Sequence, residues 1–195
     1  MQPVCGRSST CYCSSTSIAA INSTGRALRS TLPRSDRSEL GKKSGPSPTD
    51  RARPGSKHHL LVDGNGSPLV VILSAANEHD VTKLVALVTA IPPIAGRVGR
   101  PRFRPKCIYG DRAYDSPPHR RYIHALGIRT KLAKKGVAHG TGLGKIRWVV
   151  ERTISWLHQY RRLRVRFERR ADIHQAWLYL ACAHICWKKL RSSFC

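Results

Sequence analysis

Acidic residues and long apolar runs are scarce in this 195-residue sequence. Asp and Glu number 11 against 35 Lys and Arg, so the formal net charge is +24. That imbalance argues against a neutral metabolic enzyme and indicates a polyanionic partner, of which nucleic acid is the commonest. No apolar run reaches the roughly 18 residues that a membrane span requires. The first residues also lack the apolar stretch of a secretion signal, so we expect no membrane association and a cytoplasmic, nucleoid-associated location.

A closed set of paired cysteines is absent as well. The chain has seven Cys, and an odd number cannot form a complete disulfide framework. Reduced thiols are the expectation for a cytoplasmic protein. The apolar fraction of 41% is in turn too high for a fully disordered basic chain. A folded core is therefore expected, although not from the whole chain.

The beginning of the chain shows no sustained period of 2 or 3.6 residues. Residues 1 to about 56 are rich in Ser, Thr, Gly, Arg and Pro, a composition typical of a solvated, largely unstructured arm. We therefore predict a disordered N-terminal arm followed by a folded part.

From Lys57 onward, apolar runs and turn residues alternate in an orderly way. The runs at 59–62 and 68–73 flank Asp63-Gly64-Asn65-Gly66, which predicts a β-hairpin because Asn and Gly tolerate the positive φ angles of its turn. Asp80 is placed to cap a helix. The other predicted elements are strands at 107–109 and 128–132 and helices at 81–90, 116–127, 145–160 and 173–190. This order predicts a mixed α/β fold.

Two carboxylates differ from the others in their setting. Asp111 follows the predicted strand at 107–109, and ligand groups gather at strand ends of α/β sheets. Glu151 lies inside a predicted helix, on the same face as Arg147 four residues earlier. Structural roles remain open for both, because Asp111 could pair with Arg112 and Glu151 could form an i,i+4 ion pair with Arg147.

A pair of carboxylates in a strongly basic protein suggests phosphodiester chemistry. Cleavage of a phosphodiester needs an activated water and a stabilised leaving oxygen, and two Mg²⁺ ions about 4 Å apart supply both. Carboxylates are the hard ligands that these ions prefer, while Lys and Arg bind the DNA backbone. Three acids are the usual minimum for such a site, so a third acid has to be sought.

Four segments in a fixed order carry a resemblance to a known family. They begin at Pro46, Tyr109, Arg147 and Arg169 and read PSPTDRARPGSKHHL, YGDRAYD, RWVVERT and RRADIH. They resemble the DDE transposases of bacterial insertion sequences, of the insertion-sequence-five group, from about Lys42 to about Leu190. The resemblance implies an RNase H-like mixed sheet flanked by helices over residues 42–195, preceded by a disordered arm over residues 1–41.

The resemblance also implies an activity and two site residues. Such a transposase nicks DNA at element ends and joins the 3′ hydroxyl to a target, using three acids around two metal ions, Mg²⁺ or Mn²⁺. Asp111 matches the family's second acid and Glu151 the third, so both are implied to be catalytic residues and metal ligands. Gly144 stands where the family's broader pattern has Tyr, and His158 where it has Lys.

The family's first acid has no carboxylate counterpart in this chain. Residues 1–35 contain no Asp or Glu, and the nearest match is Ile21-Asn22-Ser23-Thr24, with Asn22 in the acid's place. A neutral amide is a weak Mg²⁺ ligand. Alternatively, the arm is unrelated sequence, as a truncation or frameshift would leave, and no helix-turn-helix is recognisable in residues 1–40. In both cases we expect an incomplete chain with impaired or absent catalysis.

DNA is the expected partner, as element ends and as target, and a homodimer is left open. The run from Tyr160 to Phe167 alternates basic and apolar residues, which favours an extended segment that follows the DNA backbone over a merely solvated face. The residues predicted to contact DNA are Lys57, Lys145, Arg147, Arg152, His158, Arg161 and Arg162. The alternative function is a metal-free basic DNA-binding protein, in which Asp111 and Glu151 only pair with neighbouring arginines.

Overall fold

The computed structural model describes residues 18–23, 28–29, 43–48, 51, 53–94, 101–133 and 144–194. The strands are β1 (Ile18–Ser23), β2 (Leu28–Arg29), β3 (Gly45–Pro46), β4 (Pro54–Asp63), β5 (Pro68–Ala75), β6 (Cys107–Gly110) and β7 (Arg129–Leu132). The helices are η3 (Asp80–Lys83), α1 (Leu84–Thr89), η4 (Arg112–Tyr114), α2 (Pro117–Ala125), α3 (Gly144–His158), α4 (Arg161–Arg164) and α5 (Ala171–Phe194), of which η3 and η4 are 3-10 helices. The predicted mixed α/β fold is confirmed.

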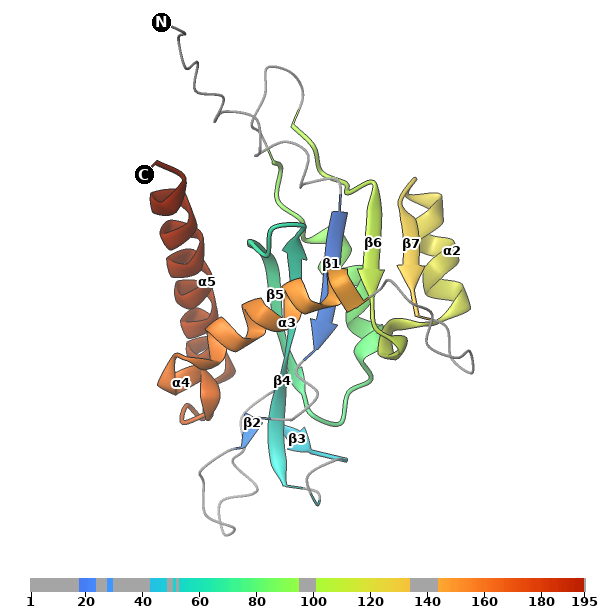
Figure 1. Cartoon of the computed structure of the whole chain (residues 1–195). Coiled ribbons are helices and arrows are strands. Elements are labelled where there is room, and N and C mark those ends of the chain that lie inside the picture. Colours follow the sequence, from blue (N-terminus) through green and yellow to red (C-terminus); the bar gives the residue numbers. More distant parts are fainter. Residues whose placement is uncertain are drawn as a thin grey trace, which may run out of the picture.

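One mixed sheet has its main strands in the order β5-β4-β1-β6-β7 (Figure 1). Strand β4 runs antiparallel to both β5 and β1, whereas β1, β6 and β7 run parallel to one another. The short strands β2 and β3 pair with the start of β4 at Gly55. Strand β1 therefore joins the antiparallel half of the sheet to the parallel half, and its carboxyl end lies at the same edge as those of β6 and β7.

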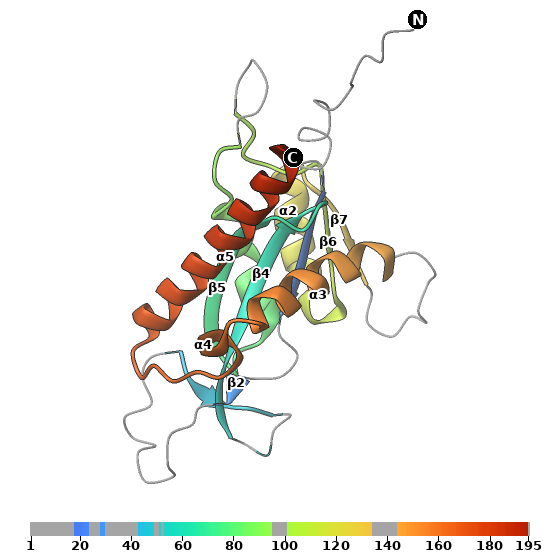
Figure 2. The same cartoon turned by 60° about the vertical axis from the view of Figure 1, so that its left-hand side comes forward.

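Helices cover both faces of the sheet. Successive side chains of a strand point to opposite faces, so each inner strand contributes to two cores. Leu60 and Leu61, neighbours in β4, accordingly belong to two different cores. The core that contains Leu60 includes Val150 of α3 and Leu178 of α5. The core that contains Leu61 includes Ile123 of α2 and residues of α1. Figure 2 shows α3 and α5 together on one side of the sheet, which makes the fold a three-layer arrangement.

The predicted hairpin between β4 and β5 is confirmed. The Asp63 carboxylate accepts hydrogen bonds from the backbone N–H groups of Asn65 and Ser67, at 3.0 and 2.6 Å. Gly66 has a φ of +82°, the left-handed conformation that the turn requires. The Thr153 hydroxyl of α3 donates a hydrogen bond to the Gly66 carbonyl oxygen, so the same turn also anchors α3.

The N-terminal range predicted to be an arm contains part of the sheet. Strands β1 and β2 both lie within residues 1–41, and β1 pairs with β4 on one side and β6 on the other. The other residues of that range lie outside the described part of the chain. The amino-acid composition of residues 1–41 did not reveal β1. A six-residue strand that is paired on both sides needs no alternation of apolar and polar residues. The folded domain therefore includes residues upstream of the predicted boundary at 42.

The helix predicted at 81–90 differs from expectation at its start. The first turn is the 3-10 helix η3, in which Asp80 is the first residue and His79 occupies the N-cap position. The Asp80 carboxylate instead accepts a hydrogen bond of 3.0 Å from Lys57 Nζ of β4. Asp80 therefore starts the helix one position later than a cap would, and its ion pair joins the helix start to β4.

The prediction of an extended segment from Tyr160 to Phe167 is wrong. This segment contains the helical turn α4, whose Leu163 is buried in the core beneath α3 and α5. Arg166 is 3% exposed rather than turned to solvent, and Phe167 is exposed. A compact turn buries Leu163, and the burial of that apolar surface outweighs the local alternating pattern. No helix among the described residues has the length and apolarity needed to cross a bilayer.

Candidate active site

The carboxyl ends of β1 and β6 bring two distant parts of the sequence together. The two strands are parallel, and Ile21 lies opposite Gly110. The next residue along each strand is Asn22 in β1 and Asp111 after β6. Adjacent parallel strands in register deliver their following residues side by side. The structure thus brings Asn22 next to the position of Asp111, as the proposed match to the family's first acid requires.

Asp111 opens a short 3-10 turn at the tip of β6. The side chain accepts a hydrogen bond of 2.7 Å from the Arg112 backbone N–H and so caps η4. The end of this turn is anchored in the core by the buried Tyr114, whose hydroxyl lies 2.9 Å from His59 Nδ1. His59 Nε2 in turn lies 2.6 Å from Ser74 Oγ of β5. The backbone that carries Asp111 is therefore fixed to β4 and β5.

Glu151 lies on the outward side of α3. Val150 and Thr153, its neighbours on the helix, are buried against the sheet and the hairpin turn, while Glu151 is exposed. Helix α3 crosses the sheet and contacts β1 and β6 (Figure 1). The helix of Glu151 thus packs on the two strands whose ends carry Asn22 and Asp111.

The donor set of this site is one carboxylate short of the implied three. Two carboxylates, Asp111 and Glu151, accompany an amide at position 22. Within the described residues, no three or more His, Cys, Asp and Glu side chains group in a way that could hold a metal ion. Two divalent ions need several anionic oxygens between them, so this donor set does not fit a two-metal centre.

Two of the predicted DNA contacts have structural partners inside the protein. Lys57 Nζ donates to the Glu78 carbonyl oxygen and to Asp80, both at 3.0 Å. The Arg152 guanidinium lies 4.3 Å from the ring centre of Trp148 and 4.9 Å from that of Trp156. It also donates a hydrogen bond to the hairpin turn. Lys57 thus joins β4 to the start of η3, and Arg152 joins α3 to the β4–β5 turn. The sequence alone does not reveal such internal partners of a basic residue.

The remaining predicted contacts differ in exposure. Arg161 is exposed, and Arg162 donates a hydrogen bond of 2.6 Å to Glu168 while it lies 5.0 Å from the ring centre of Trp177. Burial lowers the pKa of His158, and the positive charge of Arg164 lowers it further, so the imidazole is neutral near pH 7. Lys145 and Arg147 lie in the first part of α3, whose side chains are outside the described set.

A buried polar cluster under α5 is not predicted by the sequence pattern. His58 Nε2 of β4 lies 2.9 Å from His174 Nε2 of α5, and His174 Nδ1 lies 3.4 Å from Glu168 Oε2. Burial lowers the pKa of His58 well below its ordinary value, and the neighbouring His174 lowers it further. The available signal was the pair His58-His59 directly before the apolar run Leu60-Leu61-Val62 of the same strand.

Arg166 ties this cluster to the edge of the sheet. The guanidinium donates to Ser56 Oγ at 2.5 Å and to the carbonyl oxygens of Lys43, Glu168 and Arg169 at 3.0 to 3.1 Å. Burial lowers the pKa of Arg166, although Glu168 opposes the shift. The hydrogen bonds compensate for the removal of this charge from water, so the role of Arg166 is structural.

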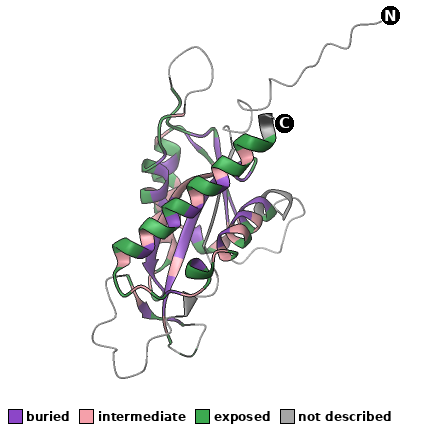
Figure 3. Ribbon diagram, turned by 90° about the vertical axis from the view of Figure 1, so that its left-hand side faces the viewer, coloured by how far each residue is buried: buried purple, intermediate pink, exposed green. Residues whose placement is uncertain are grey.

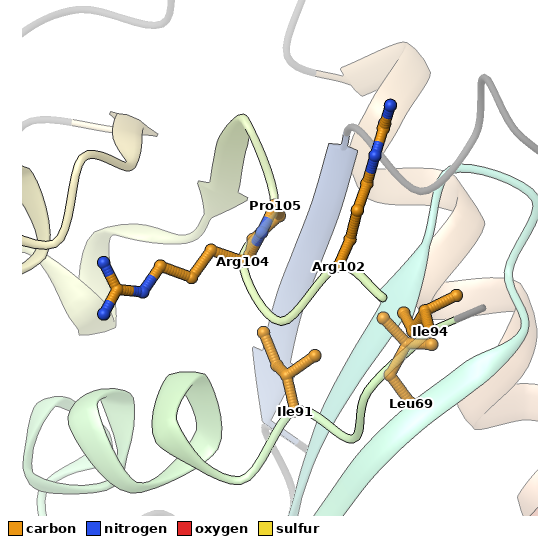
Figure 4. A pocket seen from close by; sticks show the side chains of 6 residues that line it. All are labelled: Leu69, Ile91, Ile94, Arg102, Arg104 and Pro105. Atoms are coloured by element: carbon orange, nitrogen blue, oxygen red, sulfur yellow. The ribbon is translucent and has the colours of Figure 1, made fainter. Parts of the chain in front are cut away.

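A small cavity on the α1 side of the sheet is too small for a ligand. Figure 4 shows its lining, with the apolar side chains facing one another and Arg102 and Arg104 directed away. Its volume is about 10 Å³, at the limit for a single water molecule. The residues that line it are Leu69, Ile91, Ile94, Arg102, Arg104 and Pro105.

The chain is similar to known proteins. A family model described as the transposase DDE domain matches residues 14–186. A protein of Burkholderia cepacia, named as a transposase for insertion sequence element IS402, is 60% identical over 149 residues, which cover 76% of this chain and 71% of that protein. The catalytic core domain of BIV integrase is 12% identical, with a TM-score of 0.42 over 86% of this chain and 81% of its own.

Proposed function

The chain belongs to the DDE transposase family of insertion sequences, and from this premise we propose that it binds DNA through an intact scaffold but lacks the first metal-binding carboxylate. The family acts in DNA transposition and generally uses a divalent metal ion. In this proposal Asp111 and Glu151 are the two acids that remain. Asn22 occupies the position of the missing one.

One observation carries the proposal, namely the pairing of Ile21 with Gly110 in adjacent parallel strands. It argues that Asn22 corresponds to a site residue and is not part of an unrelated arm. The family match from residue 14 supports the same view. An amide oxygen is neutral and holds Mg²⁺ more weakly than a carboxylate does. Metal binding, and with it cleavage, is therefore expected to be impaired.

DNA binding does not depend on the missing acid. With a formal charge of +24, the protein has a strong non-specific attraction for phosphates, which decreases steeply with salt. Because Lys57 and Arg152 have structural partners, we keep Lys145, Arg147 and Arg161 as the proposed contacts. Lys145 and Arg147 precede Glu151 on α3, which would set the DNA backbone beside the acids.

The test is to restore the missing carboxylate. The Asn22→Asp variant, the native chain and the double variant Asn22→Asp/Glu151→Gln are incubated with supercoiled plasmid and Mg²⁺ or Mn²⁺. We expect nicking by Asn22→Asp to exceed that of the native chain by about tenfold or more, because a charged ligand replaces a neutral one. The double variant should return to the background level. Calorimetric titration with Mn²⁺ should show the same order of affinities.

The matched control is Asn77→Asp, which makes the same chemical change at an exposed position after β5. It should leave nicking and Mn²⁺ binding unchanged. Native nicking equal to that of Asn22→Asp would show that the amide does not limit the site. If Asn22→Asp gains neither metal binding nor nicking while DNA binding persists, the metal-free DNA-binding function replaces the proposal.

A further inference from the structure

The outward face of the last helix is apolar along most of its length. On α5, the side chains of Leu180 and Trp187 are 61% and 60% exposed, and Ile173 and Trp177 are also exposed. These residues follow one another at spacings of four, three and seven, which aligns them on one side of the helix. The opposite side, with Leu178, is buried against the sheet. Figure 3 shows the exposed side running along the helix.

This stripe carries no formal charge over most of its length. From Ile173 to Trp187 the chain contains no Asp, Glu, Lys or Arg, in a protein that has 35 basic residues. A DNA-binding face would be the reverse, rich in Lys and Arg. Contiguous exposed apolar surface on a water-facing helix is typical of a contact with another protein.

A groove adjoins the stripe between α4 and α5. Its volume is about 380 Å³, enough for a large aromatic side chain. Trp177 and Leu180 belong both to the stripe and to the wall of the groove. The lining residues are Tyr160, Arg161, Arg162, Leu163, Trp177, Leu180, Ala181 and His184. Trp187 lies further along the same helix and projects outside the groove of its own chain.

We propose that α5 pairs antiparallel with α5 of a second copy of this chain, with Trp187 of each copy entering the groove beside Trp177 of the other. Heptad spacing suits helix pairing, and a two-fold axis near Cys182 sets Trp187 opposite Trp177 twice. Each copy thus supplies both the knob and the hole. The proposal is independent of the metal site, because no acid of that site lies on α5.

Area and charge both favour a second copy as the occupant. The exposed apolar side chains of the stripe present on the order of 500 Å² per copy, so a pair would bury about 1,000 Å², the lower limit of a specific interface. Antiparallel pairing also brings Asp172 at the start of one helix toward Lys188 and Arg191 at the end of the other. The uncharged centre avoids the repulsion that two strongly basic surfaces would otherwise meet.

The test measures the mass of the full-length chain by sedimentation equilibrium, at high salt to screen the net charge and over a wide concentration range. The native chain should show twice the monomer mass. Leu180→Glu and Leu180→Lys should each be monomeric, because like charges meet near the two-fold axis. An equimolar mixture of the two should recover the doubled mass, which separates loss of pairing from loss of folding.

The control is Tyr122→Glu, the same kind of change at an exposed residue of α2 on the other face of the sheet. It should leave the native mass unchanged. A native chain that is monomeric at every concentration overturns the proposal, and this includes the case in which residues 1–17 of the same chain cover the stripe. A dimer that survives Leu180→Glu also overturns it, because pairing would then use another surface.

Discussion

The Thr153 hydroxyl of α3 donates a hydrogen bond of 3.0 Å to the Gly66 carbonyl oxygen in the β4–β5 turn, across 87 positions of sequence. The same hydroxyl lies 2.9 Å from the Val149 carbonyl oxygen within its own helix. Gly66 approaches α3 so closely that a side chain there would contact the helix. This contact positions α3, and with it Glu151, relative to the strand ends.

Replacement of Gly66 by Ala should destabilise the protein for two reasons. The φ of +82° is strained for any residue with a Cβ, which costs about 1–2 kcal/mol, and the added Cβ would lie 2.9 Å from Thr153 Oγ1. Gly127→Ala is the matched control, because its φ is +77° and its Cβ would meet nothing within 4 Å. Urea denaturation should show a larger loss for Gly66→Ala, and equal losses would mean that the contact with α3 contributes nothing.

Removal of the Tyr114 hydroxyl should expose the role of the network behind Asp111. Tyr114→Phe leaves the buried His59 Nδ1 without its hydrogen-bond partner, which costs about 1–3 kcal/mol. Tyr122→Phe removes the same atom from a side chain that is 46% exposed and should change the free energy of unfolding by less than about 0.5 kcal/mol. Similar effects for the two variants in denaturant titrations would argue against the network.

The buried histidines should make stability fall at mildly acid pH. Burial lowers the pKa of His59 from 6.5 to about 4, and burial also lowers the pKa values of His58 and His174. The unfolded chain therefore binds protons that the folded chain does not. Stability contributed by these groups is complete above about pH 6.5 and is lost as the pH falls from 6.5 toward 4.

Thermal denaturation across this pH range measures the effect. The His174→Gln variant should show a flatter profile than the native chain, because one buried titrating ring is removed. His79→Gln, at an exposed histidine in the loop after β5, should keep the native profile at unchanged stability. A native midpoint that stays constant between about pH 7 and pH 4.5 would contradict the neutral buried state.

Arg166 should behave as a structural residue and not as a DNA contact. Arg166→Met removes the donors for Ser56 and for three carbonyl oxygens, and broken buried networks of this kind cost about 3–5 kcal/mol. Arg164→Met changes an exposed arginine two residues earlier and should cost less than about 0.5 kcal/mol. If Arg166→Met is as stable as the native chain and only weakens DNA binding, the original prediction of a DNA-facing segment is restored.

Local patterns predict most of the elements after residue 57. The Asp63–Gly66 turn was predictable because the hydrogen bonds of Asp63 and the φ of Gly66 are local. Helix α3 and the strand before Asp111 were predictable from apolar spacing and length. The packing of Arg166 was not, because its acceptors come from residues as far away as Lys43. A basic residue in a sequence does not reveal whether its partner is DNA or its own backbone.

The sequence by itself determined the strand and helix order of the later part, the family motifs and the scarcity of acids. It also determined that Asn22 carries no charge, since that is a property of the residue alone. Only the tertiary structure decided that Ile18–Ser23 lies between β4 and β6. The reason is that a strand inside a sheet is selected by hydrogen bonds to partners about 40 and 90 residues away, and such pairing leaves no periodic signal in the strand's own sequence.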